Sequence, residues 1–419
     1  MRKNVLIIGA GGVAHVAAHK CAQHNDILGD ICIASRRQHK CDAIIESVLR
    51  KGNLRDKNKR LYSRQIDAMD IGATVDLIRE TQSEIVINLG RTYINMSVID
   101  ACIDAGVVYI DTGSYDDENE LQGEPPWFAK SEWTRRDKCR ESGISAILGA
   151  GFDPGVTNAY CAYAKQEFDV IESIDILDVN AGDHGKFFAT NFDPEINFRE
   201  FARVFAWVDR QWVEEKIHTA KRVYDFPVVG EMPVYLTAHD EISSLPFNID
   251  ANTIRFWMGF SDHYINVFNI LSKIGMTSIE PVRTADGVEV SPLKVLAAVL
   301  PDPLSLAPNY KGQTCIGCLV KGTKDGAGKE IFIYNTCDHE ACYSETESHA
   351  ICYTAAVPAV AAAILVAQDV WNPKTMVNVE ELDPNPYLSL LDEIGLPTQL
   401  APSVLECGGL PPFSQSTRR

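Results

Sequence analysis

The chain has 419 residues, with 46% apolar and 23% charged side chains, and 39 basic against 57 acidic groups give a formal net charge of -18. This length indicates two domains, the composition excludes a mainly disordered chain, and the acidic surface argues against a nucleic-acid partner. The first apolar run stops at Gly9 and is too short for a secretory signal. We therefore expect a cytoplasmic protein that does not act on a membrane.

Residues 5–8 (VLII) form a continuous apolar run, which is typical of a strand buried in a parallel sheet. Gly9, Gly11 and Ala14 follow in the pattern G-x-G-x-x-A, and apolar residues then recur at helical spacing. In this context Gly11 lets the backbone approach a pyrophosphate at the start of a helix. We therefore expect Gly9, Gly11, Gly12 and Val13 to bind a dinucleotide.

A second strand, 31–34, ends in Ser35, Arg36 and Arg37. A site for NAD usually has an acidic residue here, which binds the ribose 2′-hydroxyl. Guanidinium groups instead suit a 2′-phosphate. The sequence thus predicts NADP(H), with these three residues at the phosphate, and the alternative is that the arginines only solvate a loop.

Strand-like segments continue at 62–68, 85–89, 107–112 and 144–148, and helices are predicted at 71–81 and 97–105. This alternation predicts an α/β domain over residues 1–155 with a Rossmann-type, doubly wound parallel sheet, whose ligands lie over the carboxyl ends of the strands. The residues expected to bind the cofactor at those ends are Asp67, Ala68, Asn88, Gly90, Gly113 and Ser114.

The middle of the chain, 156–345, has a different pattern. Residues 171–179 alternate as a one-sided strand does, and 253–258 and 331–334 are also strand-like. Helices are predicted at 204–216 and 264–274. These segments predict an α+β domain with a mostly antiparallel sheet, followed by an alanine-rich helix at 348–368 and a disordered tail at 408–419.

The twelve cysteines are scattered, and we expect reduced thiols. Cys315 with Cys318, and Cys337 with Cys342, loosely resemble a zinc ribbon. Residues three apart on a strand point to opposite faces, however, so the first two would diverge. We expect small buried side chains here and no metal site.

Several motifs carry a resemblance to a known family. They are GAGGVA at 9–14, INLGRTY at 87–93, YIDTGSY at 109–115, GAGFDPGVTN at 149–158, and the segments 254–276 and 353–365. Along nearly its whole length the chain resembles the saccharopine dehydrogenase family. The resemblance implies an NADP-dependent oxidoreductase acting on CH–NH bonds, a helical segment at 346–407 that returns to the Rossmann domain, and a homodimer formed through the α+β domain, which also binds substrate.

Residues 180–198 and 334–343 are similar to a branch of that family that makes carboxylated polyamines. This similarity implies condensation of L-aspartate β-semialdehyde with 1,3-diaminopropane or putrescine, followed by reduction of the imine by NADPH to carboxynorspermidine or carboxyspermidine. Two alternatives stay open. One is a saccharopine- or opine-type dehydrogenase with another amine and carbonyl, and the other is a non-catalytic protein that senses NADP.

A diamine and an iminium are cations, so this chemistry favours an anionic site in which protein groups orient the reactants. The catalytic candidates are Tyr93, Asp111 and Asp153, of which Tyr93 corresponds to a family tyrosine beside the substrate. Arg199 or Arg91 suits the substrate carboxylate, and the other candidates for substrate binding are Asp183, His184, His239 and Glu241. Asp183 is the first choice for the distal ammonium, because its glycine-flanked turn follows the strand at 171–179.

Structural roles compete with several of these assignments. Asp153 could cap the helix that follows it, Asp111 could orient a turn, and Tyr93 could be a packing aromatic. His184 lies in a turn, where a surface histidine is the commoner outcome.

Overall fold

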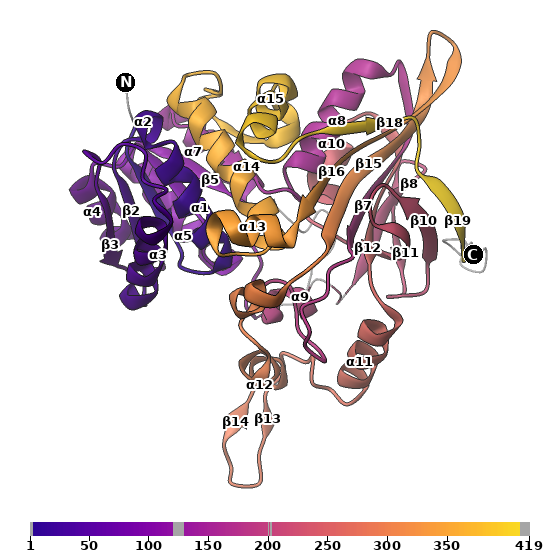
Figure 1. Ribbon diagram of the computed structural model, residues 1–419, viewed down its shortest axis with the longest axis horizontal. Helices are drawn as coiled ribbons and strands as arrows, with labels where there is room; N and C mark the ends of the chain where they lie inside the picture. Colours follow the sequence, from indigo (N-terminus) through magenta and orange to yellow (C-terminus); the bar gives the residue numbers. More distant parts are fainter. Residues whose placement is uncertain (1–2, 120–129, 200, 202, 411–419) are drawn as a thin grey trace.

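The computed structural model describes residues 3–119, 130–199, 201 and 203–410, which gather around two β-sheets (Figure 1). The N-terminal third of the chain builds one sheet and the middle builds most of the other. The C-terminal part adds strands to both.

The first sheet has seven parallel strands in the order β17-β6-β5-β4-β1-β2-β3. Their bounds are β1 (Val5–Ile8), β2 (Ile31–Ser35), β3 (Leu61–Gln65), β4 (Ile85–Asn88), β5 (Val108–Asp111), β6 (Ala146–Leu148) and β17 (Met376–Asn378). Val5 pairs with Ile31 on one side and Ile85 on the other, and all three side chains are fully buried. The predicted doubly wound sheet is confirmed, with β17 as an additional strand.

Helices cover both faces of this sheet. Helices α1 (Gly12–Gln23) and α3 (Gln38–Lys51) lie on one face together with α14 (Ala350–Ala367), and α4 (Ile71–Thr81) and α5 (Asn95–Ala105) lie on the other. The shorter helices are α2 (Asn25–Leu28), η1 (Thr92–Ile94), α6 (Lys130–Trp133) and α7 (Arg136–Ser142). The predicted helices at 71–81 and 97–105 are confirmed.

The second sheet has ten strands, of which eight follow the order β18-β16-β15-β7-β12-β11-β10-β19. Their bounds are β7 (Val170–Asn180), β10 (Lys221–Phe226), β11 (Gly230–Thr237), β12 (Ala251–Gly259), β15 (Gln313–Lys324), β16 (Ala327–Asp338), β18 (Gln399–Ala401) and β19 (Leu405–Leu410). Only β7 and β12 pair in parallel along this path, so the prediction of a mostly antiparallel sheet is confirmed. The two faces of β7 enter separate cores, with Ile174 and Ile176 on the helix-covered face and Leu177 and Val179 on the other.

Residues 204–216 form a hairpin rather than the predicted helix. Strands β8 (Val204–Val208) and β9 (Gln211–Glu215) pair antiparallel, and Asp209 and Arg210 between them have φ of 50° and 61°. A two-residue turn with both φ positive matches the twist of paired strands. Aromatic and β-branched side chains favour strands, and the rings of Trp207 and Trp212 pack edge to face at 5.3 Å across the pair.

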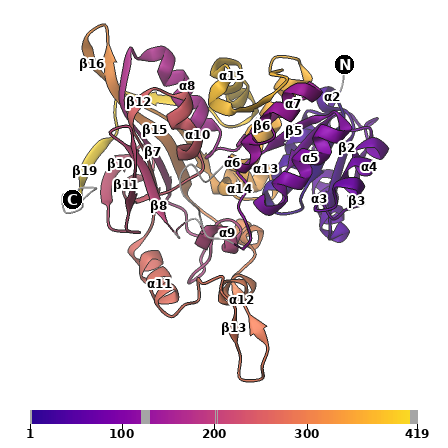
Figure 2. The same cartoon turned by 180° about the vertical axis from the view of Figure 1, so that it is seen from behind.

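The remaining elements lie around the second sheet. They are α8 (Val156–Glu167), α9 (Pro194–Arg199), α10 (Glu241–Asn248), α11 (Asp262–Lys273), α12 (Pro292–Val299), η2 (Pro303–Asn309), α13 (His339–Thr346), η3 (Val379–Glu381), α15 (Pro384–Ile394), β13 (Val282–Arg283) and β14 (Glu289–Val290). The last two strands form an arm that projects from the molecule (Figures 1 and 2).

Helix α14 lies between the two sheets and packs against α1, β4, β5, β15 and β16. By length and composition it could cross a membrane, but 89% of it is buried inside the protein, as in the central helix of a core. Its alanines let neighbouring elements approach closely. One continuous hydrophobic core therefore runs from the first sheet through α14 to the second.

Residues 408–410 complete β19 against β10, whereas the sequence predicts a disordered tail from residue 408, and the rest of that tail lies outside the described residues. Glycines at 408 and 409 have φ of 159° and 153°, which residues with a Cβ rarely adopt, and both pair with β10. Cys315 and Cys318 are buried in separate cores on opposite faces of β15, as predicted. Within the described ranges, no group of three or more potential ligands could hold a metal ion.

Candidate functional site

The candidate site lies where the carboxyl ends of the first sheet meet the second domain. Several polar contacts join the two parts. The backbone N of Ser114 donates to Asp240 at 2.7 Å, Arg91 pairs with Glu195 at 2.8 Å, and Arg199 pairs with Asp116. Residues of both domains therefore share one interface at the strand ends.

The glycines at the start of α1 have different roles. Gly9 has φ of 123°, and a Cβ there would collide with the carbonyl of Leu89. A Cβ on Gly12 would lie 2.5 Å from Sγ of Cys352, so Gly12 lets α1 approach α14. A Cβ on Gly11 would meet nothing within 4 Å.

That open space lies at the N-terminus of α1. The first amides of a helix, here those of Gly12, Val13 and Ala14, have no acceptor within it, and the helix dipole adds positive potential. The space, the amides and the dipole fit a pyrophosphate.

The end of β2 fits a 2′-phosphate. The hydroxyl of Ser35 accepts the backbone N–H of Arg37 at 3.2 Å, which shapes the turn. Arg36 and Arg37 are both exposed, and within the described part of the chain neither forms an ion pair with a carboxylate. Two guanidinium groups without an acidic neighbour suit a dianion.

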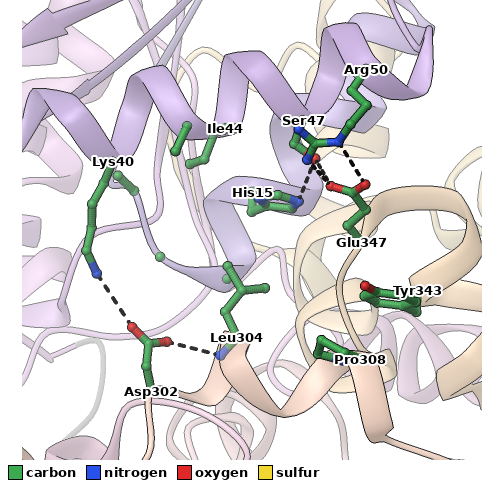
Figure 3. Close-up of a pocket in the computed structure, with 14 residues that line it drawn as sticks. His15, Lys40, Ile44, Ser47, Arg50, Asp302, Leu304, Pro308, Tyr343 and Glu347 are labelled. Carbon is green, nitrogen blue, oxygen red and sulfur yellow. Dashed lines mark hydrogen bonds and ion pairs between the residues drawn. The ribbon is translucent and has the colours of Figure 1, made fainter.

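Beside the glycine turn lies a cavity of about 350 Å³ between α1, α3 and the segment 302–347 (Figure 3). Lys40 and Asp302 form an ion pair of 3.5 Å at one end, and Arg50 and Glu347 form one of 2.6 Å at the other. Because Gly11 and Gly12 also line this cavity, it adjoins the proposed pyrophosphate position. The two ion pairs link α3 to the later segment around it.

The other expected cofactor residues shape the backbone of the strand ends. Asn88 is buried, donates to Asn95 Oδ1 at 2.9 Å, and accepts the backbone N–H of Gly90 at 3.2 Å. Asn95 in turn donates to the carbonyl of Gly113 at 2.8 Å. After β3, Oδ1 of Asp67 accepts the backbone N–H of Met69 at 3.2 Å, and the carbonyl of buried Ala68 accepts the Ser97 hydroxyl at 2.7 Å.

Asp111 is buried and already has two donors. Its carboxylate accepts the backbone N–H of Gly149 at 2.6 Å and the hydroxyl of Tyr109 at 2.8 Å. Burial and the charge of Glu132 raise its pKa well above the ordinary value. This geometry favours an orienting role for Asp111 over contact with the substrate.

Glu132 on α6 is a buried acid that was not predicted from the sequence, because its neighbours in the sequence are charged and resemble a solvated helix. Its Oε1 accepts the backbone N–H of Tyr115 at 2.5 Å, and the amide of Asn95 donates to the same atom at 3.3 Å. Burial raises its pKa to about 7. Glu132 therefore holds the loop that follows β5.

Tyr93 lies on η1 and donates to Glu195 Oε1 at 3.2 Å. Burial raises its pKa, so the phenol stays neutral and acts as a donor. The guanidinium of Arg199 lies 5.5 Å from the centre of its ring and binds Asp116 at 2.6 Å. Both arginines expected to bind the substrate carboxylate, Arg91 and Arg199, are thus engaged with acidic side chains of the protein.

His239 and Glu241 are brought together after β11. Glu241 is fully buried, and its Oε2 accepts from Nδ1 of His239 at 2.5 Å. Its Oε1 accepts the hydroxyl of Thr157 at 2.9 Å. The imidazole also stacks on Phe256 at 4.2 Å with an interplanar angle of 10°. The histidine is therefore fixed in orientation by a carboxylate, as in many acid–base sites.

Asp153 follows β6 and hydrogen-bonds to Asp178 near the end of β7. It does not cap α8, because Gly155 occupies the cap position. Burial and the neighbouring carboxylate raise the pKa of Asp153, and burial raises that of Asp178. Asp178 is not among the residues predicted for the site, although the alternation along 171–179 could have assigned it to the face of Ile174 and Ile176.

Asp183 and His184 contact a different set of residues. Asp183 is exposed, and its Oδ1 accepts the backbone N–H of Gly185 at 2.7 Å. His184 accepts the backbone N–H of Lys186 at 3.1 Å and packs edge-on against Tyr310. Both side chains close their own turn, which favours a structural role for them.

Comparisons with known proteins cover nearly the whole chain. Residues 5–147 match the family model described as saccharopine dehydrogenase NADP binding domain, and residues 151–396 match the saccharopine dehydrogenase C-terminal domain. The chain is 48% identical to a carboxynorspermidine synthase of Vibrio cholerae over 94% of its own length and 95% of that protein. It is 43% identical to a carboxyaminopropylagmatine dehydrogenase of Synechocystis sp. over 94% of its length and 96% of that protein.

Among solved structures, the saccharopine dehydrogenase (L-Glu forming) of Saccharomyces cerevisiae has a TM-score of 0.70 with 12% identity. The similarity covers 96% of this chain and all of the yeast chain. At this identity the likeness shows a shared fold.

Proposed function

The chain belongs to the saccharopine dehydrogenase family, and we propose that it is the NADPH-dependent oxidoreductase that condenses L-aspartate β-semialdehyde with a diamine and reduces the imine. The diamines that we propose are 1,3-diaminopropane and putrescine, and the products carboxynorspermidine and carboxyspermidine. The cofactor is NADP(H), in accord with the family of the first domain and with Arg36 and Arg37.

The observation that supports a cationic substrate is the concentration of acids at the interface. Four carboxyl groups gather there around the imidazole of His239, and they belong to Asp153, Asp178, Asp240 and Glu241. Burial raises the pKa of Asp240 to about 6. A site of this charge favours a diamine and an iminium.

The residues that would hold the cofactor are Gly11, Gly12 and Val13 for the pyrophosphate and Arg36 and Arg37 for the 2′-phosphate. When bound, NADPH supplies the hydride that reduces the carbon–nitrogen double bond.

The chain itself supplies proton transfer. The attacking ammonium loses one proton to His239, and the neutral amine bonds to the aldehyde carbon. His239 then returns this proton to the alkoxide, which becomes the carbinolamine hydroxyl. A second proton passes from the amine nitrogen through His239 to this hydroxyl, so that water leaves and an iminium remains. Glu241 stabilises the imidazolium during this step, and Tyr93 orients the substrate through its neutral hydroxyl.

A second candidate amine is agmatine. The observation that favours it is the 43% identity to the carboxyaminopropylagmatine dehydrogenase. A guanidinium at the distal end is also cationic and suits the same group of acidic side chains. Lysine is disfavoured, because its carboxylate adds negative charge to a site rich in carboxylates.

The test is NADPH oxidation by the purified protein with aspartate β-semialdehyde and a panel of amines. We expect turnover with 1,3-diaminopropane or putrescine and none with lysine. Preference for agmatine would support the second candidate, and preference for lysine would support a saccharopine-type enzyme. NADPH binding without turnover of any pair would contradict the proposal and leave the NADP-sensing alternative.

We also propose two domains, 1–155 for NADP and 156–345 for substrate and dimerisation. Of the segment 346–407, α14 and β17 return to the first domain, whereas the predicted return of the whole segment is wrong, because β18 and β19 pair with the second sheet. The cytoplasm is the proposed location, and a homodimer through the second domain is the proposed assembly. Light scattering on the purified protein tests the assembly, since a monomeric mass would contradict it.

A further inference from the structure

We infer that Asp178, together with Asp153, forms the binding site for the distal ammonium group of the diamine. This inference rests on the proposed function and deepens it, because it assigns the part of the site that distinguishes a diamine from a monoamine.

Strand β7 carries two buried or half-buried carboxylates with opposite surroundings. Asp175 points to one face of the sheet, where Arg255 binds it at 2.6 Å and Arg222 lies at 3.5 Å. Asp178 points to the other face, and its partner is the carboxyl of Asp153. Within the described ranges, neither Asp178 nor Asp153 forms an ion pair with an arginine or lysine.

This contrast points to a missing cation. An acidic pair in a poorly solvated place costs stability unless a positive charge compensates it. Asp175 has that charge from the protein, whereas Asp178 and Asp153 keep partial exposure. Among the described residues, the chain supplies only the imidazole of His239 to this pair, and that imidazole is already bound by Glu241. A cationic ligand can therefore reach the two carboxyls and supply the remaining charge.

Thr314 is an independent sign that a ligand completes this place. Its side chain is 0% exposed, and among the described residues its hydroxyl has no hydrogen-bond partner. Thr314 pairs with Asn180, and the next same-face position of β15, Ile316, pairs with Asp178. Cross-strand neighbours on one face lie within about 7–8 Å of each other even diagonally. The unpaired hydroxyl of Thr314 thus lies on the same face of the sheet as Asp178, beside the proposed ammonium-binding site.

The test compares 1,3-diaminopropane with 1-propylamine, which lacks the second amine. We expect Asp178→Asn to lower kcat/KM for the diamine by about 10- to 150-fold, because a hydrogen bond to a charged group is lost. The value for propylamine and the affinity for NADPH should stay close to wild type. Glu172→Gln, an exposed acid on the same strand, is the matched control and should change neither.

Thermal unfolding gives a second measurement that does not need turnover. Asp178→Asn should raise Tm in the absence of ligand, because it removes a carboxyl–carboxyl contact, and the increase in Tm that 1,3-diaminopropane gives in wild type should disappear. Thr314→Val should also raise Tm, since it removes an unsatisfied hydroxyl, and should raise KM for the diamine. This second variant tests the inference even if Asp178→Asn fails to fold.

An equal loss for both amines, or an undiminished diamine-dependent Tm shift in Asp178→Asn, would overturn the inference. If wild type turns over no amine, the proposed function fails. The Tm shifts that the diamine and the monoamine produce still decide whether the site at Asp178 and Asp153 binds a second ammonium.

Discussion

Replacing Gly11 with valine separates cofactor binding from folding. The backbone of Gly11 is extended, with φ of -94° and ψ of -169°, so a β-branched residue can adopt it. A Cβ there meets nothing within 4 Å. We therefore expect the variant to unfold at nearly the wild-type temperature.

The same side chain would occupy the position proposed for the pyrophosphate. A hydrogen bond from an amide to a charged oxygen contributes about 1.5–3 kcal/mol. Loss of two such bonds costs about 3–6 kcal/mol, which weakens NADPH binding by roughly 10²- to 10⁴-fold. Titration of NADPH fluorescence against the purified variant measures this loss.

Gly12→Ala is the matched comparison. Its Cβ would lie 2.5 Å from Sγ of Cys352, and overpacking of this kind costs about 1–3 kcal/mol. This variant should lose stability, and Cys352→Ala should restore it. Unchanged NADPH affinity in Gly11→Val would refute the assignment of the open space to the pyrophosphate, and a large loss of Tm there would show that the position is needed for packing.

Three further substitutions test the site. Arg36→Glu should raise KM for NADPH strongly and that for NADH little, because it places a carboxylate against the 2′-phosphate, and equal use of both cofactors by wild type would contradict the assignment. Glu132 keeps a proton in the folded state that the unfolded chain releases above its ordinary pKa of 4.5, so stability falls as pH rises from about 4.5 to about 7. Glu132→Gln should abolish this decrease in stability, which is about 3 kcal/mol. Unfolding by denaturant measures the free energy of unfolding at pH 5 and pH 8, and the same difference between the two pH values in the variant as in wild type would contradict the reasoning. Glu241→Gln should lower kcat by about 10²- to 10⁴-fold with NADPH affinity unchanged, and normal turnover would exclude His239 as the proton carrier.

Local patterns predicted β1 to β6, α1, α4 and α5 of the first domain, because each of these elements has a strong signal of its own. The run at 5–8 and the glycines after it give strand, turn and helix without any distant contact. The second domain was harder, since its hairpin at 204–215 depends on a turn with two positive φ values at residues that are not glycine. In that segment, packing in the folded protein favoured two strands over the helix that the spacing of apolar residues predicted.

The candidate site was only partly predictable for a similar reason. His239 and Glu241 are neighbours in sequence, so their pairing could be expected. Asp153 lies in the turn after β6 and Asp178 lies on β7, so the two meet only through the fold. Asp183 was preferred because its turn follows β7, yet an aspartate in such a turn can satisfy its own backbone, as the contact with Gly185 shows.

Helix α14 and strand β17 pack on the first domain although they lie near the end of the chain, and this has a consequence for protein synthesis. Strand β6 ends at Leu148, but β17, which pairs with it, begins at Met376, and the face of α1 at Gly12 is closed by Cys352 of α14. At roughly 5–20 residues per second, ribosomes need roughly 10–50 s to make the chain between these strands. During that interval the nascent NADP domain has an open sheet edge and an uncovered apolar helix face. We expect this protein to depend on chaperones during translation more than one whose cofactor domain is complete in its first third.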